Sequence, residues 1–394
     1  MSPLEYAQPQ TARAAYIHVP FCARRCGYCS FTLVAGRDDL IEPYLEALAR
    51  ELSWLETPRP VETLFLGGGT PTQLKGPALR RLLAHVLKWH PLDREHEFSV
   101  EANPEDLSPQ TVATLAENGV TRISLGAQSF DEQKLRALER QHSAADIRHA
   151  VELVRLHDID VSLDLIFAAP GESLDDWKSD LEMAIELQPG HISTYGLTFE
   201  RGTQFWNRLR QGHMYPVAEE LDRTMFETAI DRLDAAGFEH YEVSNFARAG
   251  KRCRHNEAYW LGEEYFAAGP GAARYLNGVR SMNHRSTTTY IARVLGRRSP
   301  LAESERLDDG ERALEVLVFA LRRREGIDRV WFEKKTGMSL DSLVGEMLQP
   351  LVELQLISDD DQRIRLTRDG LLVSDSILSR FLTGIQVATS LGQS

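Results

Sequence analysis

A short apolar or β-branched run followed by a longer amphipathic stretch recurs six times over residues 14–236. Repeated strand–helix units of this length predict a parallel sheet with helices outside it. The chain is therefore expected to be an α/β protein. The expected strands are residues 14–19, 63–66, 97–101, 122–126, 161–167 and 191–198, and the expected helices are residues 41–55, 78–88, 109–118, 144–157, 174–187 and 219–236.

Each expected strand ends in residues that a purely structural strand would not need. A cysteine cluster follows the first strand and a GGGT segment follows the second. The later positions are Glu101, Asn103, Gln128, Asp164 and Tyr195. In βα barrels, site residues gather at the C-terminal ends of the strands, where the βα loops meet above a packed core. This placement favours a partial (βα)6 barrel over a doubly wound sheet.

The alternation stops after residue 236. Residues 237–278 are rich in aromatic residues and are expected to be irregular, and a charged helical region is expected from about residue 302. Within it, residues 326–343 suggest a helix–turn–helix, residues 362–367 a β-ribbon, and residues 371–381 a last helix. We therefore expect a loose leader (1–13), a barrel (14–236), an irregular segment (237–300) and a small winged-helix-like α+β domain (301–394).

Charge and hydropathy narrow the class of function. The 58 acidic and 45 basic residues give a net charge of −13, whereas nucleic-acid binders usually carry a basic surplus. Nucleic acid is therefore not expected as a partner, and the run Arg322, Arg323 and Arg324 is interpreted as a solvated helix end. No apolar stretch is long enough to cross a bilayer, and the N-terminus does not resemble a signal peptide, which predicts a cytoplasmic protein.

Three of the four cysteines lie within eight residues, at Cys22, Cys26 and Cys29. Thiolates are soft ligands for iron–sulfur clusters, and three of them leave one iron of a [4Fe-4S] cube open to chelate a small molecule. A structural zinc site is disfavoured because it needs four ligands, usually as two pairs, and no second pair exists. Cys253 is interpreted as a buried thiol, with a heme-proximal thiolate as the alternative.

The CxxxCxYC spacing directly after a first strand resembles the signature of the radical S-adenosylmethionine (SAM) superfamily. This resemblance implies a [4Fe-4S] cluster that cleaves SAM to methionine and a 5′-deoxyadenosyl radical, with Tyr28 packed against the adenine. The GGGTP segment at residues 67–71 resembles the motif that holds the amino group of SAM. Thr70 replaces the glutamate of many members, and this departure matches the branch related to oxygen-independent coproporphyrinogen III oxidase.

Five further segments carry the resemblance to that branch along the chain: YIHVPFC (16–22), FLGGGTPT (65–72), VEANPE (100–105), RISLGAQSF (122–130) and LDLIFAAPGE (163–172). Carboxylates and amides are the groups that ribose hydroxyls and an ammonium group require. The SAM-binding residues that the resemblance implies are Tyr16, Gly68, Glu101, Gln128, Arg140 and Asp164, with Gly69 and Thr70 close by.

The branch includes oxidases, heme chaperones (HemW-type), and methyltransferases or cyclopropanases. Oxidases carry a fourth cysteine two residues after the third, where this chain has Phe31. The segment HNEAYW at residues 255–260 resembles the HNxxYW motif of the heme chaperones, which implies heme binding. The alternative is a packed aromatic loop with a core histidine. The heme-binding residues expected from this motif are His255, Asn256, Tyr259 and Trp260.

The favoured hypothesis is a heme chaperone that binds a [4Fe-4S] cluster, SAM and heme, and delivers the heme to an apo-hemoprotein. A reductant such as flavodoxin or ferredoxin is the expected electron donor. The alternatives are a coproporphyrinogen III oxidase or a related radical methyltransferase or cyclopropanase, and a regulator that uses the C-terminal domain on nucleic acid. No catalytic residue is assigned, and residues 201–215 and the C-terminal domain are candidate lids.

Overall fold

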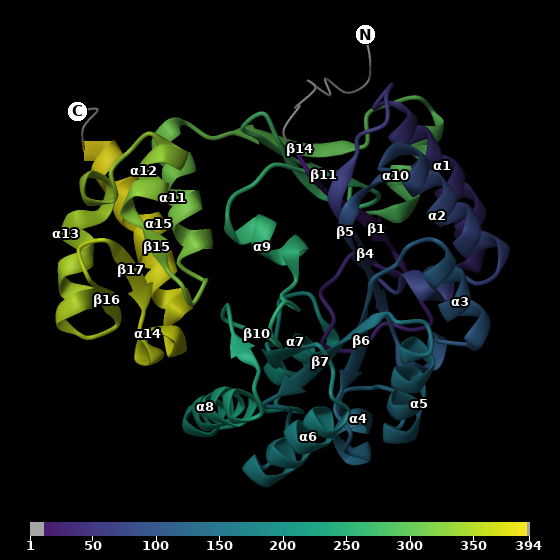
Figure 1. Ribbon diagram of the computed structural model, residues 1–394, viewed down its shortest axis with the longest axis horizontal. Helices are drawn as coiled ribbons and strands as arrows, with labels where there is room; N and C mark the ends of the chain where they lie inside the picture. The colour runs from purple at the N-terminus through teal and green to yellow at the C-terminus, as the bar shows by residue number, and fades with distance from the viewer. Residues whose placement is uncertain (1–11, 392–394) are drawn as a thin grey trace. The chain divides into compact units, whose positions relative to one another are not determined.

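The computed structural model describes residues 12–391, with side chains up to residue 382. It divides into two compact units (Figure 1). The larger unit contains the chain up to Glu239 together with Ala247–His255 and Glu264–Glu305, and the smaller contains His240–Phe246, Asn256–Glu263 and the chain from Arg306 onward. Most of the expected leader, residues 1–13, lies outside the described residues. The four-part domain division stays a prediction.

Six parallel strands form the centre of the larger unit and follow one another in chain order. Along several of them buried apolar residues alternate with polar ones, as Val100 and Ala102 alternate with Ser99 and Glu101 on β5. The strands are β1 (Ala14–Val19), β4 (Val61–Gly68), β5 (Leu92–Ala102), β6 (Arg122–Gln128), β7 (Asp160–Phe167) and β8 (His191–Gly196). Each overlaps one expected strand, so the expected α/β fold with six βα units is confirmed.

Amphipathic helices cover the outer face of these strands (Figure 1). Helix α1 shows why, because Tyr44, Leu45, Leu48 and Leu52 lie on one face and are buried. Burial of such a face, rather than helix propensity, supplies most of the stability of a helix in a protein. The covering helices are α1 (Ile41–Ser53), α2 (Pro77–Trp89), α3 (Pro109–Glu117), α5 (Ala144–Arg155), α6 (Leu174–Glu186) and α8 (Glu219–Ala235).

The expectation that residues 237–278 are irregular is wrong. Strand β11 (Tyr265–Ala268) pairs in parallel with β1, and β12 (Ala273–Leu276), β13 (Val279–Asn283) and β14 (Leu301–Arg306) extend the sheet beyond it. The turn between β12 and β13 is Asn277-Gly278, with both residues at positive φ, which is a strong hairpin signal. These strands are too short to show a clear hydrophobic period. Helix α10 (Thr287–Leu295) and the short elements β9 (Glu239–His240), β10 (Asn245–Ala247) and α9 (Arg254–Trp260) complete this region.

The smaller unit contains the expected helix–turn–helix, α12 (Arg329–Thr336) and α13 (Leu340–Glu353), joined at Gly337 with φ 79°. A three-stranded sheet of β15 (Ile327–Asp328), β17 (Arg363–Leu366) and β16 (Ile357–Asp359) supplies the wing. Helix α11 (Asp309–Ala320) begins later than expected because β14 occupies residues 301–306, and the expected last helix is two, α14 (Arg368–Leu372) and α15 (Ser374–Leu391).

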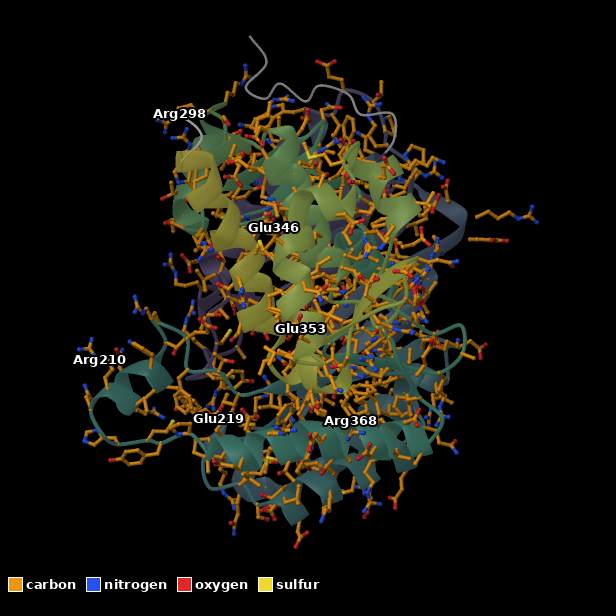
Figure 2. The ribbon with its side chains drawn as sticks, turned by 90° about the vertical axis from the view of Figure 1, so that its left-hand side faces the viewer. Arg210, Glu219, Arg298, Glu346, Glu353 and Arg368 are labelled. Atoms are coloured by element: carbon orange, nitrogen blue, oxygen red, sulfur yellow. The ribbon has the colours of Figure 1, made fainter. Side chains whose placement is uncertain are left out.

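Exposed acidic side chains lie on α13 of the smaller unit. Glu346 and Glu353, seven residues apart on α13, are both exposed (Figure 2). Arg322 pairs with Asp375, and Arg323 pairs with Glu325. These internal partners fit the interpretation of the arginine run as a helix end. No helix among the described residues is long and apolar enough to span a membrane.

Candidate functional site

The three clustered cysteines lie on one loop closed by a small pair of strands. Strand β2 (Phe21–Cys22) pairs in parallel with β3 (Val34–Ala35), so the loop leaves and returns at the same place. Inside it, the Cys29 amide donates to the Cys26 carbonyl over 3.1 Å. The Arg25 guanidinium donates to three loop carbonyls, including that of Cys29. The exposed Arg25 side chain thus ties together the returning half of the loop.

Burial disfavours the ionised form of two of the three thiols, Cys22 and Cys29. Burial raises the pKa of Cys22 to about 12, against a hydrogen bond from Thr70 that lowers it. Burial also raises the pKa of Cys29. Among the described residues, no three His, Cys, Asp or Glu side chains converge on a single ion. A [4Fe-4S] cube binds each thiolate through a different iron, so its ligands need not converge in that way, and the loop fits such a cluster.

A chain of polar contacts joins two of the thiols through the strand ends. Cys22 Sγ lies 3.3 Å from Thr70 Oγ1, which accepts a 3.0 Å hydrogen bond from Asn103 Nδ2. Arg140 Nη2 donates to Asn103 Oδ1 over 2.6 Å, and Arg140 Nη1 lies 3.8 Å from Cys26 Sγ. Thr70 and Arg140, both expected at the SAM site, are thus brought to the cysteine loop. Asn103 was expected among the polar residues at the strand ends, without an assigned role, and its bridging role was missed.

The glycine segment after β4 lets backbones approach closely. The Gly68 amide donates to Glu101 Oε2 over 2.8 Å, and its φ of 108° is open chiefly to glycine. A Cβ on Gly68 would overlap the His18 ring, and a Cβ on Gly69 would overlap the backbone at the end of β1. Glycine is therefore required here for packing against β1, whatever ligand it meets.

Two carboxyl groups face inward near the strand ends. Burial, with a smaller contribution from the nearby charge of Asp164, raises the pKa of Glu101 to about 7, against a hydrogen bond from the Gly68 amide that lowers it. Burial raises the pKa of Asp164 to about 6, against hydrogen bonds from Ser193 and Ser124 that lower it. Ser124 Oγ donates to Asp164 Oδ2 over 3.0 Å. A raised pKa means that the carboxyl group ionises less readily than usual. An ammonium group or hydroxyl that binds beside it would favour the ionised form.

Gln128 ends β6 in a backbone conformation that non-glycine residues rarely adopt. Its φ is 64°, and the pairing with β7 shifts register between Leu125 and Gln128. Such a residue costs about 1–3 kcal/mol and persists only where its surroundings hold it. The side-chain amide lies over Gly126, beside the Asn103 and Arg140 side chains. The structure thus brings Gln128 and Arg140 together.

The two predicted SAM-site tyrosines have different settings. The Tyr16 hydroxyl lies 3.0 Å from His18 Nδ1, and His18 Nε2 lies 2.7 Å from the Thr32 carbonyl. A carbonyl only accepts, so Nε2 carries the hydrogen and Tyr16 donates to Nδ1. Tyr28 packs edge-on to Phe205 at 6.0 Å between ring centroids. Its surroundings are the apolar cluster of Leu138, Ile166, Ala169 and Phe205.

The four expected heme residues lie on one short helix, α9 (Arg254–Trp260), within which the boundary between the two units falls. His255 belongs to the larger unit, where its ring stacks on Phe65 and Nδ1 lies 2.9 Å from Thr63 Oγ1. Burial lowers its pKa to about 3. Thr63 precedes Gly68 by five residues of β4, or about 16 Å at the usual rise per residue, so His255 lies far from the C-terminal strand ends.

The other three heme candidates, Asn256, Tyr259 and Trp260, belong to the smaller unit. There the Trp260 ring contacts Phe319, with centroids 6.3 Å apart. The heme-binding role of the HNEAYW segment stays a prediction. Cys253 is buried with Sγ 3.6 Å from Glu97 Oε1, which agrees with its interpretation as a buried thiol.

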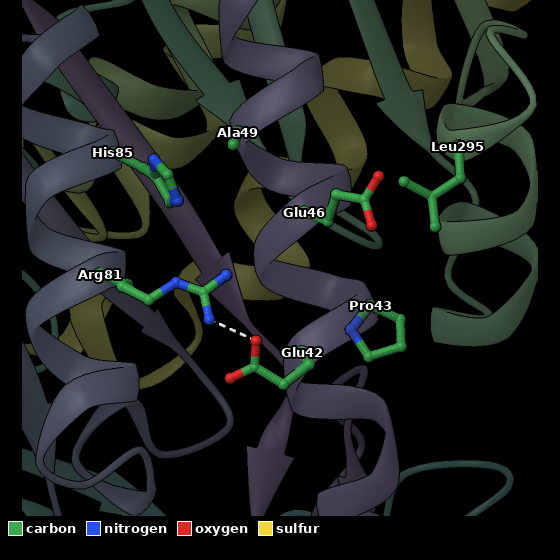
Figure 3. A pocket seen from close by; sticks show the side chains of 7 residues that line it. All are labelled: Glu42, Pro43, Glu46, Ala49, Arg81, His85 and Leu295. Atoms are coloured by element: carbon green, nitrogen blue, oxygen red, sulfur yellow. Dashed lines mark hydrogen bonds and ion pairs between the residues drawn. The ribbon is translucent and has the colours of Figure 1, made fainter.

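A shallow pocket of about 420 Å³ lies on the outer helical face, away from the strand ends. Its walls come from α1, α2 and the end of α10, and Arg81 pairs with Glu42 across it (Figure 3). No predicted site residue lines it. We therefore do not include it in the candidate site.

Two family models match the chain. The model described as "Radical SAM superfamily" covers residues 16–184, and "HemN C-terminal domain" covers residues 307–373. The heme chaperone HemW of Bacillus subtilis (strain 168) is 34% identical over 94% of this chain and 99% of its own length. HemW of Escherichia coli (strain K12) is 33% identical over 93% and 97%. The chain belongs to the HemW family of radical SAM proteins. This confirms the resemblance drawn from the motifs.

A solved structure confirms the fold of this HemW-family member. Coproporphyrinogen III oxidase (HemN) from Escherichia coli superposes with a TM-score of 0.85 at 20% identity, covering 96% of this chain and 92% of that one. At this identity the likeness speaks for architecture alone. The combination of a partial radical SAM barrel with a C-terminal HemN-type domain is therefore established.

Proposed function

We propose that this HemW-family member is a heme chaperone that holds a [4Fe-4S] cluster on Cys22, Cys26 and Cys29, binds SAM beside it, and delivers heme to hemoproteins. The observation that carries the proposal is its similarity, over nearly its full length, to proteins named as heme chaperones. The geometry adds a thiol loop flanked by polar strand ends. An apo-hemoprotein and a reductant such as flavodoxin or ferredoxin are the proposed partners, in the cytoplasm.

The side chains at the C-terminal strand ends would each contact a different group of SAM. The cluster, when bound, would supply an open iron for the amino and carboxylate groups of SAM and the electron for its cleavage. Glu101 and Asp164 suit the ammonium group and the ribose hydroxyls, because an ionised carboxylate accepts hydrogen bonds from both. Arg140 provides a buried cation beside Cys26 Sγ. Tyr28, on its apolar cluster, offers a flat face for adenine.

The second candidate is a coproporphyrinogen III oxidase, favoured by the shared fold. Phe31 stands against it, since this exposed aromatic residue occupies the position of the fourth cysteine that oxidases of the branch carry. Anaerobic incubation of the cluster-loaded protein with SAM, a reductant and coproporphyrinogen III separates the two. We expect no protoporphyrinogen. Catalytic amounts of that product would reject the chaperone assignment.

The heme prediction is tested by titrating heme into the cluster-loaded protein and following its absorbance. We expect wild-type protein to bind heme and His255→Gln to bind it about tenfold more weakly, because a lost ligand costs at least about 1.4 kcal/mol. His85→Gln, a half-buried histidine on α2, is the control and should bind heme normally. Equal affinity in all three proteins would remove His255 from the heme site.

A further inference from the structure

Helix α4 (Glu132–Ala137) places a lysine inside the protein. Lys134 Nζ contacts the carboxylates of both Glu172 and Asp180, and it lies 2.9 Å from Asp180 Oδ2. The three side chains are only 4%, 1% and 2% exposed. The ammonium also lies over the Trp177 ring, 5.1 Å from its centroid. A buried carboxylate is tolerated when its remaining oxygens accept hydrogen bonds. The hydrogen-bond donors to Glu172 and Asp180 therefore show which segments of the chain these side chains hold in place.

The carboxylates are bonded to two different loops. Asp180 accepts hydrogen bonds from Ser129 Oγ and the Phe130 amide, each over 2.7 Å, in the loop after β6. Glu172 accepts one from the Ala169 amide over 2.8 Å, in the loop after β7. Lys134 thus joins two neighbouring loops at the C-terminal ends of their strands.

Each loop begins with a non-glycine residue at positive φ and leads to the candidate SAM site. Gln128, at 64°, directly precedes Ser129, and its amide lies beside Arg140. Ala168, at 61°, directly precedes Ala169, which belongs to the apolar cluster behind Tyr28. A left-handed residue keeps its conformation only when its neighbours are fixed, and these neighbours are fixed by the two carboxylates.

We propose that Lys134, Glu172 and Asp180 are positioning residues that set the spacing between Gln128 and the wall behind Tyr28, and so the fit of the nucleoside half of SAM. The proposal rests on the proposed function, because it assumes that SAM binds at this rim. Lys134 itself would touch no ligand. Without its charge the two carboxylates repel, and the loops that they hold are free to relax.

The test compares Lys134→Met with Arg122→Met in the cluster-loaded protein. Arg122 forms a second buried ion pair, with Glu97 at 3.0 Å. It lies at the opposite end of β6 from Gln128. SAM affinity is measured by equilibrium dialysis, alongside iron content and unfolding temperature. We expect Lys134→Met to bind SAM about tenfold more weakly with its iron retained. Arg122→Met should lose stability yet stay within about twofold of wild-type affinity.

Ser129→Ala is a milder variant that removes one hydrogen bond to Asp180 and the hydrogen bond that Ser129 Oγ accepts from the Asp131 amide. It should weaken SAM binding about threefold even if Lys134→Met does not fold. Wild-type affinity in Ser129→Ala and in folded Lys134→Met would overturn the positioning role. So would an equal loss in Arg122→Met, since general softening would then explain the effect. A wild-type protein with an intact cluster and no SAM binding would overturn the proposed function itself, and this inference with it.

Discussion

Glu101, a proposed SAM-binding residue, carries a raised pKa that lowers the stability of the ligand-free protein. Its pKa is raised from 4.5 to about 7, so between these values the folded protein keeps a proton that the unfolded chain has released. The unfolded state then binds fewer protons than the folded state, and the free energy of unfolding falls as pH rises through this window. The stability cost at neutral pH is about 2–3 kcal/mol for a shift of this size.

Glu101→Gln should therefore flatten the pH dependence of the ligand-free protein. We expect wild-type protein to lose about 2–3 kcal/mol of unfolding free energy between about pH 4.5 and pH 7 more than the variant does. Urea unfolding followed by circular dichroism at both ends of this window measures the difference. Parallel profiles for the two proteins would contradict the assignment of the raised pKa to Glu101.

Gly68 offers a second test at the same scale. In Gly68→Ala the new methyl group would enter the His18 ring, at a backbone φ of 108°. Gly36→Ala is the matched control, because its φ is 63° and its Cβ would meet nothing within 4 Å. We expect the control to cost about 1 kcal/mol of strain and Gly68→Ala at least 2 kcal/mol more. Denaturant unfolding measures the free energy of unfolding of each variant. Equal losses in the two variants would show that the contact with His18 is unimportant.

Helix α7 (Gln204–Arg210) packs directly on the cysteine loop. The Phe205 amide donates to the Gly27 carbonyl over 2.9 Å, and a Cβ on Gly27 would overlap the Phe205 ring. At the far end of the helix, Arg210 points away from the body of the protein (Figure 2). The lid role expected for residues 201–215 stays a prediction, and within that segment Phe205 contacts the cysteine loop.

Phe205→Ala should remove this contact. We expect a loss of about 3–5 kcal/mol from the cavity, together with faster loss of iron from the reconstituted cluster. Phe332→Ala removes an equally buried phenylalanine from the smaller unit and should retain iron like the wild type. The rate of iron release to a chelator is the measurement. Similar rates in both variants would mean that α7 does not support the cluster loop.

The sequence allowed the βα units to be predicted because each is long enough to show its period. Strand β7, expected at 161–167, occupies Asp160–Phe167, and α6, expected at 174–187, ends at Glu186. The strands β11 to β14 show no clear alternation and were missed, and the hairpin signal at Asn277-Gly278 was overlooked. Of the site, the motif residues were found by type and position. The bridge through Asn103 and the brace at Lys134 were not, since they depend on contacts between distant segments.

At the scale of the molecule, the net charge of −13 disfavours nucleic acid as a partner of this chain. Affinity for nucleic acid comes largely from cations that displace counterions, and two arginines of the one basic run pair with Asp375 and Glu325. We expect no shift of duplex DNA in an electrophoretic assay at about 0.15 M salt. A shift that weakens steeply with added salt would contradict this.

The smaller unit is assembled from three separate stretches of chain, His240–Phe246, Asn256–Glu263 and the residues from Arg306 onward. On a translating ribosome, the first two stretches emerge long before the third. At about 5–20 residues per second, the roughly 130 residues after Glu263 take about 7–26 seconds to synthesise. During that interval the Trp260 ring lacks the contacts with Phe319 and Arg322 that it makes in the folded unit. Slow decoding of the last third of the message therefore lengthens the time in which the nascent chain exposes an unfinished core.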